Sequence, residues 1–501
     1  MFYKLKTVLK CFSKEKYVFF DLNDSSLALA KNIAKNKQRI VLFVLDKQLA
    51  DNSVKQKIKT IGARYFVQWF NYHSLICNQL LKKVLLKNKT YLFFFSGLDV
   101  VNLKSVSKFY DSWTNDEYEK VRSCFELIVR TQNKLTHSVI ENYVNNAPFK
   151  VPYSLFNDAE LIAAEVVKQF PPIDTLTINT QNAKIIDTYE TLIIGFDETG
   201  EAILRKLIEA TQFVGTQFKA TVVINETNEC AKHYFVNYPE IKNHFNVSFL
   251  NIDAQSNKFY EWLNQQNTIK QIMVSAGSDK ENIFIASEVS ISLSNRNISY
   301  IPVIVIARDN EASFWKLRNW PFLHFVGMNE TIFTERKVLK ADYLYKAKAI
   351  HQFYNQLKPF AQRIAWEQLS DIKKETNIAI AESLYAKLKL MGKTFEEVKQ
   401  MSEMEFQLFL QAQPERLLNL AIAEHLRWNA TYFTNGWKTW HLKEIPEDSP
   451  HQNEKQKLHA CLVDWNALKE VEKRFNIPFQ FNDFNNVLIT RILISNYFPE
   501  V

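Results

Sequence analysis

A loop in the middle of the chain has glycines where the phosphates of a dinucleotide would need them. Gly195 and Gly200 follow an apolar run and precede a helical pattern, and Asp197 stands between them, where the middle glycine of the motif is usual. Glycines in such a turn let the backbone approach a pyrophosphate, whereas a carboxylate there crowds and repels it. We expect further contacts at neighbouring strand ends. The additional candidates for binding NAD or an adenine nucleotide are Thr199, Asn225, Gly277 and Ser278.

An earlier loop has the opposite combination: it lacks the glycines, but an acid ends the strand that follows. Residues 21–26 contain no glycine, but Asn23 and Ser25 can cap the helix that follows, and the free N–H groups of its first turn favour an anion. Asp46 ends the next apolar run, where an acid would bind a ribose. Each of the two loops therefore lacks one required element. Two interpretations stay open: these are nucleotide-binding loops, or they are turns that serve the fold alone.

The most distinctive aromatic motif lies near the C-terminus. Glu424 and Arg427 are one turn apart in a helical pattern, and Trp428 has the spacing of a core residue, so we expect it to be buried. Trp437 and Trp440 follow the end of that helix. We expect at least one of these two to line a concave surface with Glu424 or Arg427, as a stacking platform for a purine base. The alternative is that the aromatic side chains are core.

Alternating strands and helices must position the first two loops. Apolar runs of strand length, separated by helical patterns, recur through residues 17–150 and again through residues 185–335. This predicts an α/β protein with two tandem Rossmann-like, doubly wound parallel sheets, followed by a mainly helical domain. The expected parts are a basic N-terminal helix 1–16, a first domain 17–150, a connector 151–184, a second domain 185–335 and a C-terminal domain 340–501.

The second domain resembles a known nucleotide-binding family. Residues 192–200, 274–282 and 300–306 are similar to the N-terminal domain of Trk-type potassium-uptake regulators. That resemblance implies a Rossmann fold that holds NAD(H) or an adenine nucleotide. Asp197 and Asn225 depart from the family's pattern.

The C-terminal motif resembles a different family. Residues 421–437, with their acid, their tryptophan and a closing Gly-Trp pair, are similar to the ryanodine-receptor repeat, or RyR domain, and residues 457–468 resemble its second motif. The resemblance implies a non-enzymatic module that accompanies nucleotide-binding domains in bacteria.

Composition narrows the class of protein further. The formal charge of +8 comes from scattered residues, which does not favour nucleic acid as the partner. The five cysteines form no CxxC pair, which predicts a reduced, cytoplasmic chain without a metal site. No apolar run is long enough to span a membrane, although the basic start leaves a position at the inner membrane surface open. The motifs of common nucleophilic enzymes are absent, so we expect no catalysis.

These features predict a regulator that senses a small nucleotide-like ligand, as a monomer or homodimer. The resemblances suggest prokaryotic defence or stress signalling as its context. Two alternatives stay open. One is a cytosolic gating subunit of a potassium channel or transporter, which would need a membrane-protein partner. The other is a degenerate NAD-dependent oxidoreductase.

Overall fold

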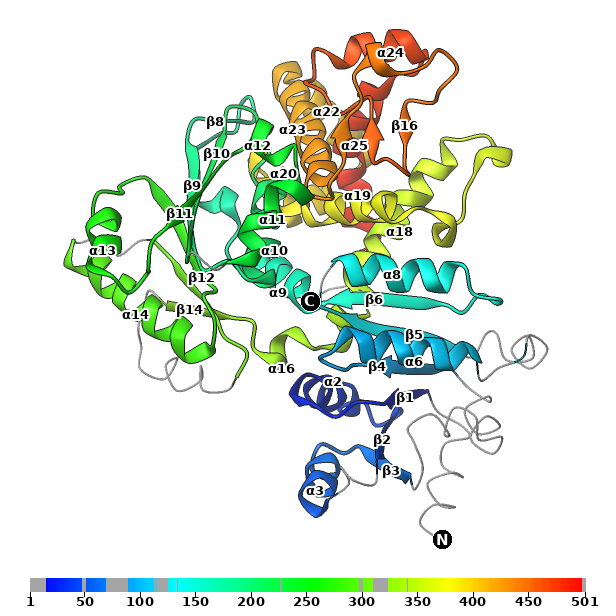
Figure 1. Cartoon of the computed structure of the whole chain (residues 1–501). Helices are drawn as coiled ribbons and strands as arrows, with labels where there is room; N and C mark the ends of the chain where they lie inside the picture. The colour runs from blue at the N-terminus through cyan, green and yellow to red at the C-terminus, as the bar shows by residue number, and fades with distance from the viewer. Residues whose placement is uncertain are drawn as a thin grey trace. The chain divides into compact units, whose positions relative to one another are not determined.

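The computed structural model of the 501-residue chain consists of two compact units (Figure 1). The first comprises Met1–Ile162 and Gly327–Ala341, and the second comprises Ala163–Val326 and Asp342–Val501. A segment that follows the second sheet in the sequence therefore belongs with the first unit. The structure describes all residues except 1–14, 47–50, 69–88, 112–113, 115–124, 133, 226–227, 297–300, 310–322, 340 and 498–501. The predicted basic helix 1–16 lies almost entirely outside the described residues.

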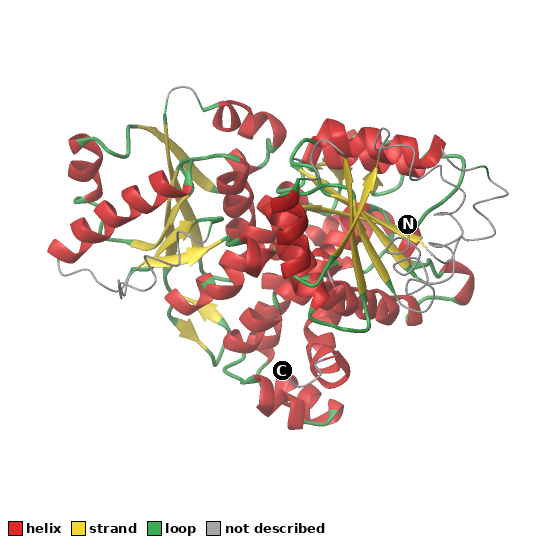
Figure 2. Ribbon diagram, turned by 90° about the horizontal axis from the view of Figure 1, so that it is seen from below, coloured by secondary structure: helices red, strands yellow, loops and turns green. Residues whose placement is uncertain are grey.

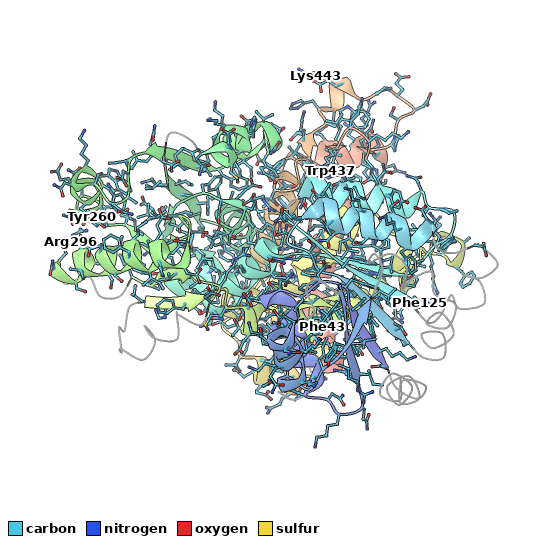
Figure 3. All side chains as sticks on the ribbon, turned by 60° about the horizontal axis from the view of Figure 1, so that its bottom comes forward. Phe43, Phe125, Tyr260, Arg296, Trp437 and Lys443 are labelled. Carbon is cyan, nitrogen blue, oxygen red and sulfur yellow. The ribbon has the colours of Figure 1, made fainter. Side chains whose placement is uncertain are left out.

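A parallel six-stranded sheet forms the first unit, in the strand order β3-β2-β1-β4-β5-β6. This is the doubly wound order. Successive strands are added toward one edge of the sheet from β1 to β3 and toward the other edge from β4 to β6, so the switch point lies between β1 and β4. Continuous apolar runs make strands that are buried on both faces, and Phe19 of β1 stacks on Phe93 of β4 with ring centroids 4.4 Å apart. Figure 3 shows Phe43 and Phe125 on the same sheet. The strands are β1 (Lys16–Phe19), β2 (Ile40–Asp46), β3 (Arg64–Gln68), β4 (Thr90–Phe94), β5 (Phe125–Thr131) and β6 (Tyr153–Asn157).

Helices connect these strands, and two short ones come from the later segment. The connecting helices are α2 (Asp24–Ala34), α3 (Asn52–Thr60), α6 (Asp99–Asp111) and α8 (Lys134–Asn145). The short helices are α16 (Asn329–Ile332) and α17 (Glu335–Val338). Both pack on α2. Lys31 of α2 pairs with Glu330 at 2.7 Å, and Arg39, just before β2, pairs with Glu335.

The second unit repeats the architecture. Its parallel sheet has the order β11-β10-β9-β12-β13-β14, so both predicted Rossmann-like sheets are confirmed. The strands are β9 (Thr188–Ile194), β10 (Gln217–Ile224), β11 (Asn246–Asn251), β12 (Ile269–Val274), β13 (Val303–Ile306) and β14 (Leu323–Val326). The helices are α9 (Asp158–Gln169), which contains the boundary between the units, α10 (Glu198–Ala210), α11 (Glu229–Asn237), α12 (Ile241–His244), α13 (Asn257–Leu263) and α14 (Asp279–Asn295).

The C-terminal part of this unit is mainly helical, as predicted (Figure 2). Its longest helix, α23 (Pro414–Phe433), packs on α10 of the Rossmann-like part and on α25 (Phe479–Tyr497). A small sheet of β15 (Lys438–Thr439), β16 (Gln452–Asn453) and β17 (Leu458–His459) was not predicted, because strands of two residues leave no periodic signal. The other helices are α18 (Ala341–Gln356), α19 (Asp371–Glu382), α20 (Leu384–Leu390), α21 (Phe395–Gln400), α22 (Glu403–Gln411) and α24 (Leu468–Phe475). Among the described helices of the chain, none has the length and apolarity required to cross a membrane.

Candidate functional site

Gly195 is required by the close approach of two loops at the switch point of the second sheet. Its φ is +85°, and a Cβ added there would lie 2.2 Å from the Cα of Ala276, just beyond β12. Only glycine adopts this backbone without strain and leaves room for the neighbouring loop. The glycine predicted for phosphate contact thus has a structural reason to be present.

Asp197 is the N-cap of α10. Its Oδ1 accepts hydrogen bonds from the backbone N–H of Gly200 at 2.8 Å and from the Ser275 hydroxyl at 2.9 Å. These are donors that a pyrophosphate would need at the start of this helix. The chain's own carboxylate has taken the place of the phosphate, so the residues of this loop do not fit a pyrophosphate.

The surroundings of that helix start are acidic. Burial, together with Glu198, Glu201 and Asp197, raises the pKa of the half-buried Cys230 thiol to about 11. A field that disfavours a thiolate also disfavours any other anion at this place. The nearby carboxylates thus disfavour a phosphate at this helix start, in the same sense as the hydrogen bonding.

The other predicted residues of this loop region lie around the same strand ends. Thr199 is buried and accepts a 3.5 Å hydrogen bond from the Arg308 guanidinium. Ser278 is the N-cap of α14, while Gly277 and Asn225 are exposed. The structure thus brings the predicted set together, but their hydrogen bonds serve caps and turns.

Removing the Asp197 carboxylate should change dinucleotide binding. We expect Asp197→Gly to strengthen NAD binding by on the order of 1 kcal/mol or more, because a half-buried negative charge is lost and the Gly200 N–H is released. The glycine costs only a few tenths of a kcal/mol as a cap. Isothermal titration with NAD measures the effect, and Asp197→Asn, which keeps the cap without the charge, is the control. Tight NAD binding by the unaltered chain with no gain in the glycine variant would contradict it.

In the loop between β1 and α2, side chains of the loop itself form hydrogen bonds with the helix start and with a neighbouring strand end. Asn23 and Ser26 form a capping box at α2, and the Asn23 Nδ2 donates to the carbonyl oxygen of Phe95 at 2.7 Å, which joins the ends of β1 and β4. Ser25 is buried and lies 3.4 Å from the Asn329 side chain. Asp46 ends β2 as predicted, and its side chain lies outside the described part.

Phe333 covers the carboxyl ends of the neighbouring strands in this unit. It packs edge-to-face on Phe95 with centroids 5.8 Å apart, and the Arg130 guanidinium lies 5.8 Å from its ring. Arg130 is itself paired with buried Asp158. In a doubly wound sheet a ligand binds at these strand ends. Here the segment with α16 and α17 occupies them.

The aromatic residues of the C-terminal motif form a packed cluster. Trp437, labelled in Figure 3, is 4% exposed and packs edge-to-face on Tyr432 with centroids 4.9 Å apart. Trp428 lies 4.3 Å from the same ring and is only partly buried. Trp437 is therefore buried rather than part of an open surface, and Trp428, which was expected to be buried, is only partly so. Gly436 ends the helix but turns the chain back onto it, since the Trp437 N–H bonds to the Tyr432 carbonyl oxygen.

Trp440 is partly buried and packs against the core cluster of Ile445, Cys461 and Leu468. Neither it nor Trp437 reaches Glu424 or Arg427 across a concave surface among the described residues. The aromatic residues of the motif therefore pack together as core, whereas Glu424 and Arg427 face a cavity that these tryptophans do not line.

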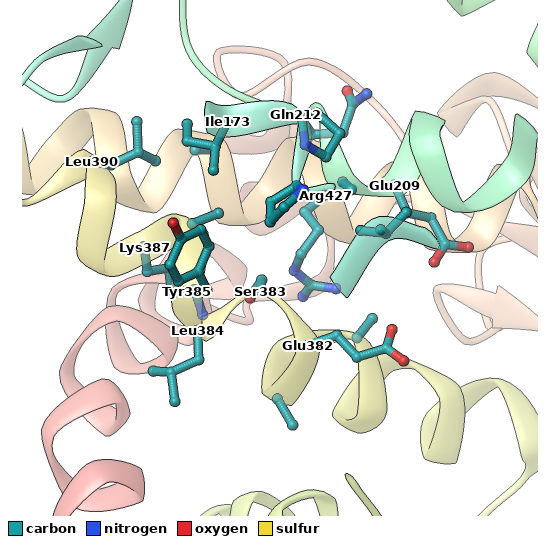
Figure 4. Close-up of a pocket in the computed structure, with 18 of the residues that line it drawn as sticks. Ile173, Glu209, Gln212, Glu382, Ser383, Leu384, Tyr385, Lys387, Leu390 and Arg427 are labelled. Carbon is teal, nitrogen blue, oxygen red and sulfur yellow. The ribbon is translucent and has the colours of Figure 1, made fainter. Parts of the chain in front are cut away.

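Glu424 and Arg427 line a cavity of about 450 Å³ within the second unit (Figure 4). Its walls are the end of α9 and the turn after it, the C-terminal half of α10, the junction of α19 with α20, and α23. Apolar side chains, including alanine, leucine, phenylalanine, valine, isoleucine and proline, make most of the lining. The charged residues in it include Lys206, Glu209, Glu382, Lys387, Glu424 and Arg427.

The first charged cluster is fully buried. Arg427 donates to Glu424 through Nε at 3.2 Å and a terminal nitrogen at 2.5 Å, and the Lys387 ammonium lies 3.0 Å from the same carboxylate. Burial alone would raise the pKa of Glu424, but the two cations outweigh it and hold the pKa at about 2. Burial lowers the pKa of Lys387. The carboxylate is thus ionised at neutral pH and orients both cations.

The second charged cluster joins the Rossmann-like and helical parts of this unit. Lys206 on α10 contacts Glu209 at 3.1 Å and Glu382 at the end of α19 at 2.9 Å. The Thr434 hydroxyl donates to Glu209 at 2.6 Å. Burial raises the pKa of Glu382 in spite of its lysine partner.

Sequence reasoning missed Lys206, Glu382 and Lys387. Lys206 and Glu209 are three residues apart on a helix, which is an ordinary surface spacing. Nothing in the sequence indicates that Lys206 meets Glu382, 176 positions later, or that Glu209 meets Thr434, 225 positions later. Among the described residues, no group of three or more histidine, cysteine or acidic side chains is arranged to hold a metal ion.

Comparison with known proteins adds little beyond the fold. No protein-family model matches the chain, and no curated protein matches it. Among solved structures it is similar to one of the subunits of dipicolinate synthase from Bacillus halodurans, at 11% identity and a TM-score of 0.24, covering 66% of this chain and 97% of the other. It is also similar to a dipicolinate synthase from Bacillus subtilis, at 12% identity and a TM-score of 0.20, covering 59% and 80%. Values this low carry no information about activity or ligand.

Proposed function

We propose that this chain is a non-enzymatic regulator that binds a small nucleotide-like molecule in the cavity between α10, α20 and α23. The observation that carries the proposal is the cavity itself. Its volume of about 450 Å³ lies within the range of small-molecule sites, and it combines apolar walls with a few buried charged groups. Both Rossmann-like loops, by contrast, have their ligand positions filled by side chains of the chain.

The position of the cavity suits a sensor because two parts of the unit meet there. The first turn of α10 lies at the switch point of the second sheet, and its last turns line the cavity. A ligand that binds better to one arrangement of α10 against α19 and α23 shifts the population toward that arrangement. Lys206–Glu382 and Glu209–Thr434 are the contacts that such a shift would break or strengthen.

The biological context remains a proposal that rests on the two family resemblances. A role in prokaryotic defence or stress signalling follows from the RyR resemblance, and gating of a potassium channel or transporter follows from the Trk resemblance. Both fit a ligand-driven change in the second unit. Each requires a protein partner, and a monomer or a homodimer would serve.

A variant that fills the cavity tests the proposal. Ala386 on α20 lines it, and Ala386→Phe should abolish binding of whichever member of a panel of NAD, NADH, ATP, ADP and AMP raises the melting temperature of the unaltered chain. A ligand at a hundred times its Kd stabilises by about 2.7 kcal/mol, which is a shift of several degrees. Ala361→Phe, at an exposed position outside the cavity, is the matched control.

The outcomes separate the alternatives. Loss of the shift in Ala386→Phe alone supports a cavity ligand. A shift that persists in Ala386→Phe but disappears in a variant of the Gly195 loop would place the ligand at the Rossmann crevice instead. Turnover of NADH with a substrate would support the degenerate oxidoreductase.

A further inference from the structure

The chain between α18 and α19 forms a closed surface loop (Figure 1). Asn355, in the last turn of α18, binds both backbone groups of Ile364: its Nδ2 donates to the carbonyl oxygen at 2.7 Å, and its Oδ1 accepts from the N–H at 3.3 Å. The Nε2 of His351 lies 2.7 Å from the same carbonyl oxygen. These contacts hold the two ends of the loop together beside the helix. A loop closed in this way is compact and has a defined surface.

Apolar side chains of this loop face the solvent. Every residue from 356 to 365 is exposed. Phe360 is 86% exposed, more than any other large apolar side chain among the described residues, while Leu357 is 56% and Ile364 39% exposed. Single exposed apolar residues are ordinary, but three within eight residues of one closed loop form an apolar patch, and such patches mark interaction sites. Folding does not bury these side chains, so a binding partner has that stabilisation still to gain.

The chain around the loop is basic. Residues 343–366 contain three lysines, one arginine and no aspartate or glutamate. Glu367, the first acid after them, lies 3.8 Å from Lys348. Among the described residues, no acidic side chain pairs with Lys358 or Arg363, which stand on the loop itself. The loop is therefore positive, and a negatively charged partner suits it.

The two cations of the loop stand on either side of its most exposed aromatic ring. Lys358 precedes Phe360 by two residues, and Arg363 follows it by three. The Arg363 guanidinium lies 5.7 Å from the centre of the Phe360 ring, and its Nε donates to the Lys358 carbonyl oxygen at 3.2 Å. Cations beside an exposed apolar group match the surface of an anionic bilayer, where the apolar group enters the acyl-chain boundary and the charges stay at the headgroups.

The shape and size of the loop favour a lipid surface over a protein. Its ten consecutive exposed residues, 356–365, form a convex surface rather than a groove. A stable protein–protein interface uses about 20–30 residues on each side, which is more than this loop offers. A bilayer, by contrast, accepts a few protruding apolar side chains with cations beside them, because its surface is soft and its negative charge is spread over many headgroups.

We infer that this loop binds peripherally to a lipid bilayer that contains anionic headgroups. Leu357, Phe360 and Ile364 enter the boundary of the acyl chains, while Lys358 and Arg363 contact the headgroups. The inference is independent of the proposed ligand site, since no residue from 356 to 365 lines the cavity. A regulator attached in this way stays at a membrane surface without a spanning helix.

Flotation of the full chain with lipid vesicles tests the inference. One set of vesicles is phosphatidylcholine alone, and the other contains roughly one third phosphatidylglycerol, which supplies the negative surface potential. We expect binding to the anionic vesicles and much weaker binding to the neutral ones. Binding should decrease as the salt concentration is raised from about 0.05 to about 0.5 M, because salt screens the cations.

Variants of the loop separate insertion from charge. Phe360→Ser should weaken binding to the anionic vesicles about tenfold or more, whereas Phe360→Leu, which remains apolar, should keep most of it. Lys358→Gln combined with Arg363→Gln should also weaken binding about tenfold or more and reduce its dependence on salt. Phe284→Ser on α14 and Lys258→Gln on α13, both at exposed positions, are the matched controls. Thermal melts check that each variant is folded.

Four results would overturn the inference. The first is no binding of the unaltered chain to either kind of vesicle, and the second is equal binding to both kinds. The third is binding that neither loop variant weakens, which places the membrane contact in another part of the chain. The fourth is a changed oligomeric state of Phe360→Ser in light scattering without a change in vesicle binding, which makes the loop a contact between two copies of the chain. None of these results bears on nucleotide binding in the cavity.

Discussion

Replacing Glu424 by glutamine is expected to destabilise the second unit by about 3–5 kcal/mol, the cost of leaving buried charges without their counter-ion. Glu424 is 2% exposed and is the carboxylate that Arg427 and Lys387 share. Glutamine has the same shape, so lost packing does not contribute to the effect. Urea unfolding followed by far-UV circular dichroism gives the change in free energy.

The effect should depend on pH in a defined direction. The pKa of Glu424 is lowered from 4.5 to about 2 in the folded chain, so its stabilisation is complete above pH 4.5 and disappears as the pH falls through about 2. The difference between the unaltered chain and Glu424→Gln should therefore shrink over that window. Glu403→Gln, exposed on α22, should change stability by less than about 0.5 kcal/mol.

An apolar replacement of the whole cluster distinguishes pairing from packing. Leucine at 424 with methionine at 387 and at 427 should recover most of the stability that Glu424→Gln loses, because no buried charge remains. Equal melting of Glu424→Gln and the unaltered chain at pH 7 would show that the cluster is not buried as described.

Gly195→Ala is expected to cost about 3 kcal/mol or more. The positive φ alone costs an alanine roughly 1–2 kcal/mol. Its Cβ would also lie 2.2 Å from the Ala276 Cα and 2.3 Å from the Ser275 carbonyl oxygen, which are backbone atoms. Relief requires β9 and β12 to move apart at the switch point, and this disturbs the centre of the second sheet. The midpoint of urea unfolding measures the loss.

Gly277→Ala is the matched control for that substitution. It lies in the adjoining loop, but an added Cβ there would meet only the flexible end of the Glu281 side chain within 3 Å. We expect a loss below about 1 kcal/mol, since that side chain can turn away. Similar losses in the two variants would mean that Gly195 is not held by the approach of the two loops.

The sequence by itself determined the class of fold, because periodicity is a local property. Continuous apolar runs such as those of β1 and β9 predict strands buried on both faces, and the helical patterns between them require parallel pairing. The helix start at Asn23 and the turn at Gly195 were also readable, since caps and tight turns depend on neighbouring residues. The order of the strands within each sheet, by contrast, came from the tertiary structure.

The tertiary structure decided which contacts the predicted residues make. In the sequence, Asp197 is an acid at a position where a phosphate-binding loop has a glycine. Only the structure shows that its carboxylate accepts a hydrogen bond from Ser275, at the end of another strand. In the sequence, Trp437 follows the end of a helix and is a candidate for an exposed stacking surface. In the structure the chain turns back after the helix, and Trp437 packs on Tyr432. Glu424 and Arg427 were predicted as a pair, but Lys387 and the cavity beside them come from separate helices. Such sites depend on contacts between residues far apart in the chain. These contacts produce no regular spacing in the sequence from which they could be predicted.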